Sequence, residues 1–288
     1  MRKIAVANMK GGVGKTTSTI IVADTLSAIR GERVLALDLD PQANLSWALM
    51  GPTPFENHAP NATMTRWLQD ISKGKRGAFA SALELVGVKK GGRSYRAKGD
   101  RAEFRLAVSN TRLRFEEMRF EGPIENDPAL VLSERLNEAL EQLAPSFDYC
   151  VMDCSPALSA LTRAGLRIAD AIIVPPPLNA LCFESLETFR TMGLRDLLGL
   201  PTPVYVMRTR VGAAMGKFEQ NRIVTRLIDR EADRLIAQLR PDIVESVDYM
   251  RALNPPETGG AMTLSTKYGS RVADLEILAL SLKDRGVI

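Results

Sequence analysis

The sequence predicts an α/β fold, with a doubly wound and mostly parallel sheet that carries helices on both faces. Short apolar runs alternate with longer segments of helical periodicity, which is the order of elements in such a fold. Several of these runs are apolar almost throughout, as parallel strands buried on both faces are. The first run leads directly into a glycine-rich turn, and doubly wound folds bind their ligands where strands end.

The expected elements follow in order along the chain. Strands are expected at residues 3–7, 34–38, 104–108, 149–153, 171–174 and 203–207. Helices are expected between them at residues 16–30, 129–143, 183–198 and 218–240. This order predicts a single domain over residues 1–288, interrupted by a basic, glycine-rich insertion at about residues 72–103.

The composition is that of a soluble globular protein, with 45% hydrophobic and 25% charged residues. No uninterrupted apolar stretch approaches the ~20 residues of a membrane-spanning helix, and the chain enters its first strand without a signal peptide. The three cysteines lack the spacing of a disulfide framework or a zinc site. We therefore expect a cytoplasmic protein.

A phosphate-binding loop follows the first predicted strand, where residues 10–17 read Lys-Gly-Gly-Val-Gly-Lys-Thr-Thr. A strand, a glycine-rich turn and a helix in this order surround a polyphosphate with backbone N–H groups. Lys15 is then the cation expected on the β- and γ-phosphates, and Thr16 offers a hydroxyl to Mg²⁺. Lys10 is one lysine more than this general pattern requires.

The other loop residues are expected to bind the phosphates through the main chain. Gly11, Gly12 and Gly14 are expected to take positive φ angles, and they let the backbone approach the phosphates without an intervening Cβ. Val13 and Thr17 complete the loop, so their N–H groups belong to the same phosphate-binding set.

Three carboxylates end predicted strands near this loop. Asp38 and Asp40 lie two residues apart, so their side chains point to the same side of the chain. One can serve the Mg²⁺ shell while the other orients an attacking water, although a pair of capping or solvated aspartates has the same spacing. Asp153 ends a further apolar strand and precedes Cys-Ser-Pro, which is a Walker B arrangement that places an acid near the metal.

Together, these segments resemble the ParA/MinD family of deviant Walker A P-loop ATPases, and most closely its ParA branch. The similarity rests on the loop at residues 10–17, on Asp-Leu-Asp-Pro-Gln-Ala-Asn at 38–44 and on Asp-Cys-Ser-Pro at 153–156. Residues 175–185 and 251–259 resemble later family segments, the second of them the nucleotide-base loop that includes Pro256. The resemblance covers nearly the whole chain except about thirty residues of the insertion, and it implies the P-loop NTPase fold of the deviant Walker type.

The resemblance implies a role for each site residue. Lys10 is the signature lysine, which reaches the phosphates of the partner subunit in an ATP-sandwich homodimer. Asp40 is the water-positioning carboxylate, and Asp38 and Asp153 are the acids of the metal shell. ATP and Mg²⁺ are the implied cofactors. Intrinsic turnover is expected to be slow and to be stimulated by a ParB-like or other cargo adaptor protein.

DNA is the second implied partner, because ParA relatives bind it nonspecifically as ATP dimers. Arg208, Arg210 and Arg251 lie at positions comparable to basic residues of those relatives. Each is expected to be either a DNA-phosphate contact or an ordinary surface arginine. The stretch 66–114 holds thirteen Lys/Arg against four Asp/Glu. Such a charge excess is expected either of a solvated surface insertion or of a contact to nucleic-acid phosphates.

The leading interpretation is a nucleoid-associated ATPase that partitions a plasmid or chromosome, or positions another cargo. An amphipathic helix is also expected in the tail at residues 270–288. A MinD-like membrane-surface ATPase would need a basic amphipathic anchor, but this tail mixes acidic and basic residues opposite its apolar face. We therefore expect no membrane partner. A metabolic P-loop enzyme is the other alternative: an ATP-dependent ligase, or an iron–sulfur reductase component that would need two well-placed cysteines.

Overall fold

A central sheet of eight strands organises the part of the chain that the computed structural model describes, which is residues 1–75, 79, 83–86, 103–120, 127–176, 186, 188–197, 199, 202–211, 236–256 and 262–288. The strand order is β3-β4-β2-β5-β1-β6-β7-β9, and every pairing is parallel except that of β3 with β4. The strands are β1 (Arg2–Val6), β2 (Val34–Asp38), β3 (Glu84–Leu85), β4 (Phe104–Ala107), β5 (Tyr149–Asp153), β6 (Ala171–Val174), β7 (Val204–Val206) and β9 (Ile236–Gln238). Separate from this sheet, β8 (Thr209–Val211) and β10 (Ile243–Val244) form a two-stranded parallel ribbon.

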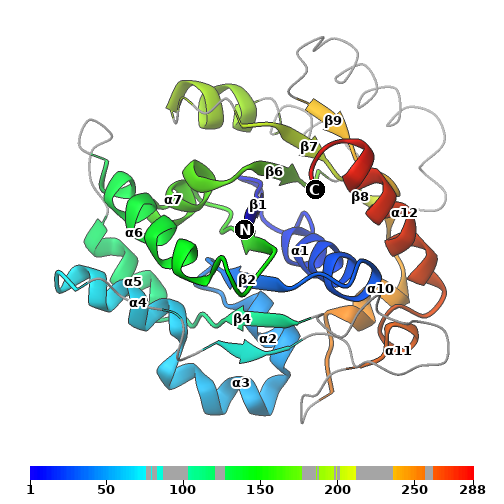
Figure 1. Cartoon of the computed structure of the whole chain (residues 1–288), viewed down its shortest axis with the longest axis horizontal. Coiled ribbons are helices and arrows are strands. Elements are labelled where there is room, and N and C mark those ends of the chain that lie inside the picture. Colours follow the sequence, from blue (N-terminus) through cyan, green and yellow to red (C-terminus); the bar gives the residue numbers. More distant parts are fainter. Residues whose placement is uncertain are drawn as a thin grey trace.

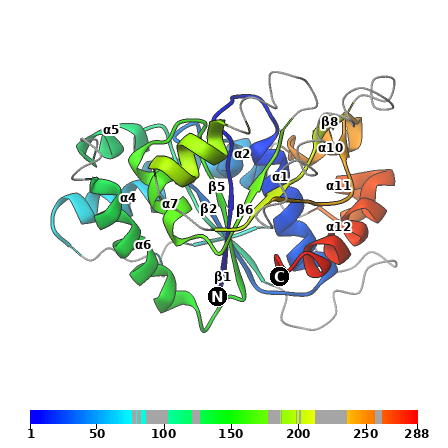
Figure 2. The same ribbon diagram turned by 90° about the horizontal axis from the view of Figure 1, so that it is seen from above.

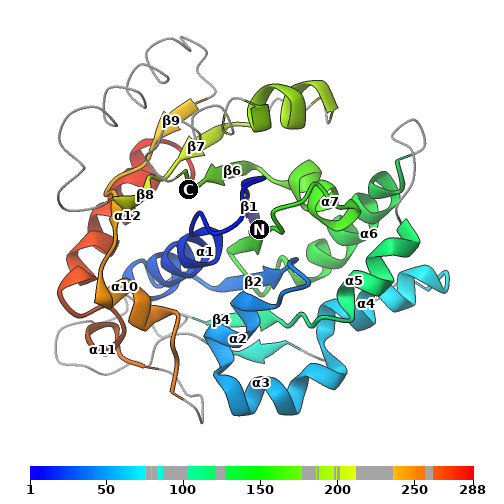
Figure 3. The same ribbon diagram turned by 180° about the vertical axis from the view of Figure 1, so that it is seen from behind.

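Helices cover both faces of the sheet, as Figure 2 shows with α4 to α7 on one side and α1 and α10 to α12 on the other. The α-helices are α1 (Lys15–Asp24), α2 (Asn44–Met50), α3 (Pro52–His58), α4 (Thr63–Ser72), α5 (Leu113–Glu117), α6 (Pro128–Leu143), α7 (Ala160–Ile168), α10 (Val247–Ala252), α11 (Leu264–Tyr268) and α12 (Val272–Asp284). Helix α1 continues as a π-helical turn over Thr25–Ile29, and a second π-helical segment spans Phe189–Leu197. In Figure 1, and from behind in Figure 3, α6 and α12 lie on opposite sides of the molecule, with β1 between them.

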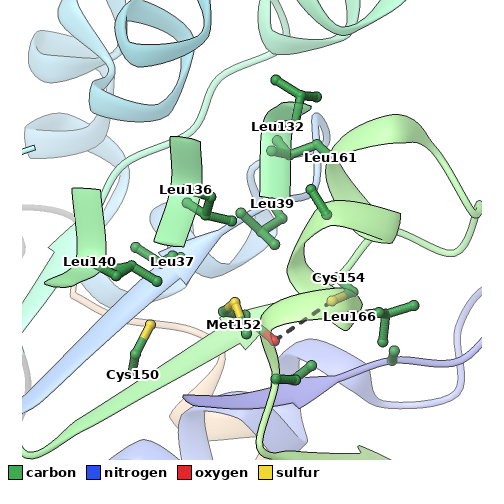
Figure 4. Close-up of a cluster of buried hydrophobic side chains, with 14 of the residues drawn as sticks. Leu37, Leu39, Leu132, Leu136, Leu140, Cys150, Met152, Cys154, Leu161 and Leu166 are labelled. Carbon is green, nitrogen blue, oxygen red and sulfur yellow. Dashed lines mark hydrogen bonds between the residues drawn. The ribbon is translucent and has the colours of Figure 1, made fainter. Parts of the chain in front are cut away.

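The strands are apolar on both sides because each face of the sheet packs on its own layer of helices. Along β5, Cys150 and Met152 face the cluster shared with α6 and α7, while Val151 faces the cluster shared with α1 and α12. Figure 4 shows the first cluster, in which Leu136 and Leu140 of α6 point toward the sheet. Two buried faces explain why the strands read as continuous apolar runs.

Most of the predicted elements are confirmed, and one is wrong at its end. The strands at 34–38, 149–153 and 171–174 have the predicted bounds, and the helix at 129–143 begins one residue earlier as α6. Residues 218–235 of the predicted helix 218–240 lie outside the described residues. Its end is wrong, because Ile236–Gln238 forms β9 and pairs with β7.

The predicted insertion and the predicted C-terminal helix can both be located in part. Helix α4 ends where the insertion was expected to begin, and β3 lies inside the insertion and extends the sheet; residues 87–102 lie outside the described residues. The tail forms α12, whose Leu275, Leu278 and Leu282 are fully buried. None of the described helices has the length and apolar character needed to cross a membrane.

Candidate nucleotide-binding site

The three strands that carry the predicted site residues are neighbours in the sheet. Strand β5 lies between β1 and β2, and Asp153 is in register with both Val6 and Asp38. Because all three strands are parallel, the loop that follows β1 and the acids that end β2 and β5 meet at one edge. This is the edge at which doubly wound sheets bind ligands.

The glycines of the phosphate loop leave its inner surface open. Gly12 and Gly14 have φ angles of 69° and 91°, and Gly14 caps the start of α1. Gly11 is not in the left-handed region, so the prediction of a positive φ there is wrong. A Cβ added to Gly11 or Gly12 would nevertheless meet no atom within 4 Å. The backbone therefore borders free space that a phosphate group can fill.

Lys15 crosses this loop as the first residue of α1. Its Nζ donates to the carbonyl oxygen of Lys10 at 2.9 Å, and the side chain is almost fully buried. Burial lowers the pKa of Lys15, and the charges of Asp153 and Asp40 partly offset this effect. A polyphosphate would add negative charge beside this buried cation, which favours its ionised form.

Asp153 holds two threonine hydroxyls from α1. Its Oδ2 accepts from Thr16 Oγ1 at 2.8 Å, and its Oδ1 accepts from Thr19 Oγ1 at 3.0 Å. Burial raises the pKa of Asp153 to about 7, although the two hydroxyl bonds act against this shift. Two of the three predicted Mg²⁺ ligands, Thr16 and Asp153, are thus in direct contact. Thr19 was not predicted, and only its place one turn beyond Thr16 could have suggested it.

Asp38 holds the segment that follows it. Its Oδ2 accepts from the N–H and the Oγ of Ser46, at 2.8 and 2.6 Å, and its Oδ1 accepts from the N–H of Asp40 at 3.2 Å. The carboxylate is fully buried, and this burial together with the charge of Asp153 raises its pKa well above its usual range. The structure therefore gives Asp38 a positioning contact with the loop that carries Asp40. Its role in the metal shell stays a prediction.

Asp40 lies at the wall of the pocket in a fixed orientation. Its Oδ1 accepts from the N–H of Gln42 at 2.9 Å, and its carbonyl oxygen accepts from Ser109 Oγ at 3.1 Å. The N–H of Ser109 in turn donates to Ser46 Oγ at 2.9 Å. Ser46 and Ser109 were not predicted, because nothing in the sequence indicates that the ends of β2 and β4 share hydrogen bonds.

Lys10 is half-buried at the entrance of the loop. Its N–H donates to Asn8 Oδ1 at 3.0 Å, and Asn8 Nδ2 donates to the carbonyl oxygen of Pro175 at 3.1 Å. This chain of bonds fixes the start of the loop to the segment after β6.

A pocket of about 970 Å³ extends from the loop toward the C-terminal part of the chain. Its polar end contains loop residues 11–17 and Asp40, and its other end contains apolar side chains. Those apolar side chains are Trp47, Ala48, Ile243, Val244, Val247, Met250 and Leu253. Pro256, the predicted base contact, is exposed and is not among the described residues that line the pocket. Leu253, three residues earlier, does line it. The pocket fits a ligand with a polyanionic part and an apolar part.

The arrangement fits ATP with Mg²⁺. The glycine backbone leaves space for phosphates, Lys15 supplies a buried cation, and Thr16 and Asp153 supply the hydroxyl and carboxylate oxygens that Mg²⁺ prefers. Mg²⁺ is usually held by one or two such protein ligands together with substrate phosphates and water.

The predicted DNA-binding arginines differ in their surroundings. Arg208 is 3% exposed and its guanidinium is paired with Asp242, so the prediction of a DNA-phosphate contact is wrong for this buried side chain. Arg251 is exposed at the end of α10 and bonds Asp248 at 3.1 Å. Arg210 is exposed, but its Nη1 donates to the carbonyl oxygen of Gly12 at 3.1 Å, inside the pocket lining.

Residues 1–194, more than half of the chain, match the family described as an AAA domain. Chromosome partitioning protein ParA of Caulobacter vibrioides is 31% identical over 198 residues, which cover 67% of this chain and 62% of that protein. The chain belongs to the ParA/MinD family of P-loop ATPases. Sporulation initiation inhibitor protein Soj of Bacillus subtilis is 28% identical over 184 residues, which cover 64% of this chain and 61% of Soj. The matches thus span about three fifths of the length of these two relatives.

Solved structures share the fold of this ParA/MinD member over nearly its whole length. Apo McdA of Cyanothece has a TM-score of 0.69 at 23% identity and covers 99% of both chains. Cobyrinic acid a,c-diamide synthase of Mycobacterium smegmatis, solved with an ATP analogue and magnesium, has a TM-score of 0.66 at 21% identity and covers 100% of this chain and 96% of its own. At these identities the likeness concerns the fold, which McdA and a synthase have in common.

Proposed function

We propose that this chain is an ATPase that dimerises on ATP, binds DNA nonspecifically in that state, and partitions or positions a cargo such as a plasmid or chromosome. The observation that carries the proposal is the phosphate loop with Lys10 at its entrance and the oriented carboxylate of Asp40 at its wall. The family relationship supports it, because relatives named chromosome partitioning protein ParA and sporulation initiation inhibitor protein Soj match 67% and 64% of the chain.

Each site residue has a physical task in this proposal. The N–H groups of the loop and Lys15 bind the phosphates. Thr16 and Asp153 would hold Mg²⁺, which when bound would supply positive charge beside the transferred phosphoryl group. Asp40 orients the attacking water, because its carboxylate is fixed by the Gln42 N–H at the pocket wall. Lys10 reaches the phosphates bound by the partner subunit, so dimerisation depends on ATP.

DNA binding is assigned to the ATP dimer and to exposed arginines such as Arg251. Contacts of this kind go to phosphates and are sequence-independent, so the affinity should fall steeply with salt. A ParB-like or other adaptor protein is the proposed source of stimulated hydrolysis.

A DNA-retention assay tests the proposal directly. Wild type, Lys10→Ala, Asp40→Ala and the matched surface control Lys283→Ala are applied to immobilised DNA with ATP, with ADP and without nucleotide. We expect retention with ATP alone, loss of retention in Lys10→Ala, and persistence in Asp40→Ala and Lys283→Ala. Equal DNA retention with ATP, with ADP and without nucleotide, or no retention even at low salt, would refute the proposed function. Light scattering of the same samples tests the ATP-dependent dimer.

The alternative is a ligase that couples ATP hydrolysis to a small substrate. The pocket volume is the observation that favours a ligase, because about 970 Å³ lies at the upper end of the usual range for ligand sites. A ligase would bind ATP without DNA retention and without a requirement for Lys10 in dimer formation. The same assay therefore separates the two functions.

A MinD-like membrane function is not favoured by α12. The apolar residues Leu275 and Leu278 are buried in the core, and the exposed side carries Glu276 and Asp284 as well as Lys283. An anchor for an anionic membrane needs a cationic exposed face.

A further inference from the structure

Strand β8 contacts the phosphate loop from the side on which the loop presents its carbonyl oxygens. Thr209 Oγ1 donates to the carbonyl oxygen of Val13 at 2.6 Å, and Arg210 Nη1 donates to that of Gly12 at 3.1 Å. Thr209 is 1% exposed, and its side chain also approaches Gly14, where an added Cβ would lie 3.4 Å from Thr209 Cβ. Two consecutive residues from the C-terminal part of the chain therefore hold consecutive peptide groups of the loop.

These two bonds orient the N–H groups of the same peptides. In a trans peptide the C=O and N–H groups point in opposite directions. The carbonyl of Gly12 shares its peptide plane with the N–H of Val13, and the carbonyl of Val13 shares its plane with the N–H of Gly14. A carbonyl drawn toward β8 thus turns the adjoining N–H away from β8. N–H groups so oriented form the anion-binding concavity of a phosphate loop.

The clamp residues are themselves held in place. Arg210 has a φ of 53°, in the left-handed region that non-glycine residues rarely adopt and that persists only where the surroundings enforce it. Arg210 Nε donates to Glu245 Oε1 at 3.0 Å. The N–H of Thr209 donates to the carbonyl oxygen of Pro176 at 3.1 Å, and Thr209 pairs with Ile243 of β10.

We propose that Thr209 and Arg210 form a clamp on the carbonyl side of the phosphate loop, and that they are positioning residues which pre-orient its N–H groups for a bound nucleoside polyphosphate. Glu245 holds Arg210 in this clamp. The inference rests on the proposed nucleotide site and deepens it. It assigns Arg210 to the nucleotide site in place of the DNA contact that the sequence predicts.

The clamp has a distinctive expected effect on nucleotides. The loop N–H groups bind phosphates that ATP and ADP share, so loss of the clamp should weaken both ligands by a similar factor. Residues that respond to the γ-phosphate or to the partner subunit should instead separate ATP from ADP. In steady-state hydrolysis the clamp should therefore change KM and leave kcat within about twofold, because it contributes uniform binding.

The test measures Kd for fluorescently labelled ATP and ADP with Mg²⁺, and the thermal midpoint without nucleotide. Thr209→Val keeps the shape and removes the hydroxyl, so we expect both Kd values to rise about tenfold, equivalent to about 1.4 kcal/mol. Thr209→Ser restores the donor and should bind within about twofold of wild type. A merely structural role for Thr209 would not give equal losses for both nucleotides with rescue by serine.

A second variant keeps the proposal testable if Thr209→Val does not fold. Arg210→Asn removes the guanidinium but tolerates the left-handed conformation, so the thermal midpoint should stay or rise while both Kd values rise about threefold to fivefold. Glu245→Gln should have a smaller effect in the same direction. Arg135→Asn, which removes an exposed arginine of α6 paired with Glu138, is the matched control and should leave Kd unchanged.

The outcomes separate the clamp from the proposed function. Wild-type affinity in folded Thr209→Val and Arg210→Asn would overturn the clamp and leave the function standing. Loss of DNA retention with unchanged nucleotide Kd in Arg210→Asn would also overturn it and return Arg210 to the DNA contact. A wild-type protein that binds neither nucleotide would overturn both.

Discussion

The two ends of the pocket are built in different ways. At the phosphate end, three parallel strands in register carry a loop and two acids whose side chains are buried and hydrogen-bonded. At the other end, strand β10 and the short helix α10 supply apolar side chains, of which Val247 is 66% and Met250 56% exposed. The phosphate end is fixed by strand register, whereas the other end depends on contacts between distant segments. We therefore expect chemistry and tight binding from the first and selectivity from the second.

The largest expected effect is the loss of Lys15 at the phosphate end. Lys15→Ala removes the buried cation beside Asp153 and Asp40, so we expect the Kd for MgATP to rise at least about 100-fold, or roughly 3 kcal/mol. Titration calorimetry measures this. Lys283→Ala on α12 is the control, and an equal loss in both variants would mean that the loop does not bind the phosphates.

The second prediction separates two acids of the same end. Asp40→Asn should leave the Kd for MgATP within about threefold and lower hydrolysis roughly 100-fold or more, because the water loses its orienting carboxylate. Asp38→Asn should instead lower the stability of the nucleotide-free protein by about 1–3 kcal/mol, because its NH2 group must face one of two N–H donors, that of Ser46 or that of Asp40. Denaturant unfolding and phosphate release distinguish them. If Asp38→Asn unfolds like wild type, its positioning contact contributes little.

The sequence predicts the residues at the ends of strands, but it does not predict the bonds between distant segments. The loop, Asp38 and Asp153 are visible because each follows an apolar strand, and parallel strands end at one edge. The bond between Ser46 and Ser109 joins residues 63 positions apart, and the bond from Thr209 to the loop spans 196 positions, so these contacts were missed. Hydrophobic periodicity reports local structure and contains no information on such contacts.

Three short strands in the C-terminal part of the chain were missed for a further reason. Strands β8, β9 and β10 have three, three and two residues, which is too short for a period of two to be recognised. The end of the predicted helix 218–240 was wrong because Ile236–Gln238 is too short to be recognised as a strand. Its pairing with β7 is a tertiary contact, which the local pattern does not report. The buried Arg208 was read as a surface residue because its partner Asp242 lies 34 positions away.

The third prediction tests the division between the two ends. Leu253→Ala removes an apolar side chain at the far end of the pocket, so the Kd for MgATP should rise about fivefold to tenfold through lost apolar contact. Inorganic tripolyphosphate has no base and should bind Leu253→Ala as it binds wild type. Competition against a fluorescent nucleotide measures both ligands. Equal losses for ATP and tripolyphosphate would mean that the two ends are not separate.

The smallest expected effect on nucleotide binding concerns a carboxylate away from both ends. Asp127 caps α6 by accepting from the N–H of Ala129 at 3.0 Å, and it pairs with Arg163 at 2.7 Å and Arg167 at 3.2 Å. Burial acts to raise the pKa of Asp127, but the bonds from the two arginines and the Ala129 N–H outweigh it and hold the pKa below its usual range. In contrast, burial raises the pKa values of Asp38 and Asp153 at the phosphate end.

A lowered pKa in the folded state means that Asp127 stabilises the protein above about pH 4, the ordinary pKa of an unfolded aspartate, and that this stabilisation is lost as the pH falls through the folded-state pKa. Asp127→Asn keeps a good capping residue and removes the charge, so it should cost about 2 kcal/mol of unfolding free energy at pH 7. That difference should shrink steadily below pH 4, as urea unfolding at several pH values would show. Nucleotide Kd at pH 7 should not change, because Asp127 stabilises the α6–α7 layer and does not contact the pocket. A constant difference between the two proteins from pH 7 to pH 3 would mean that the arginine pairs do not depend on the charge of Asp127.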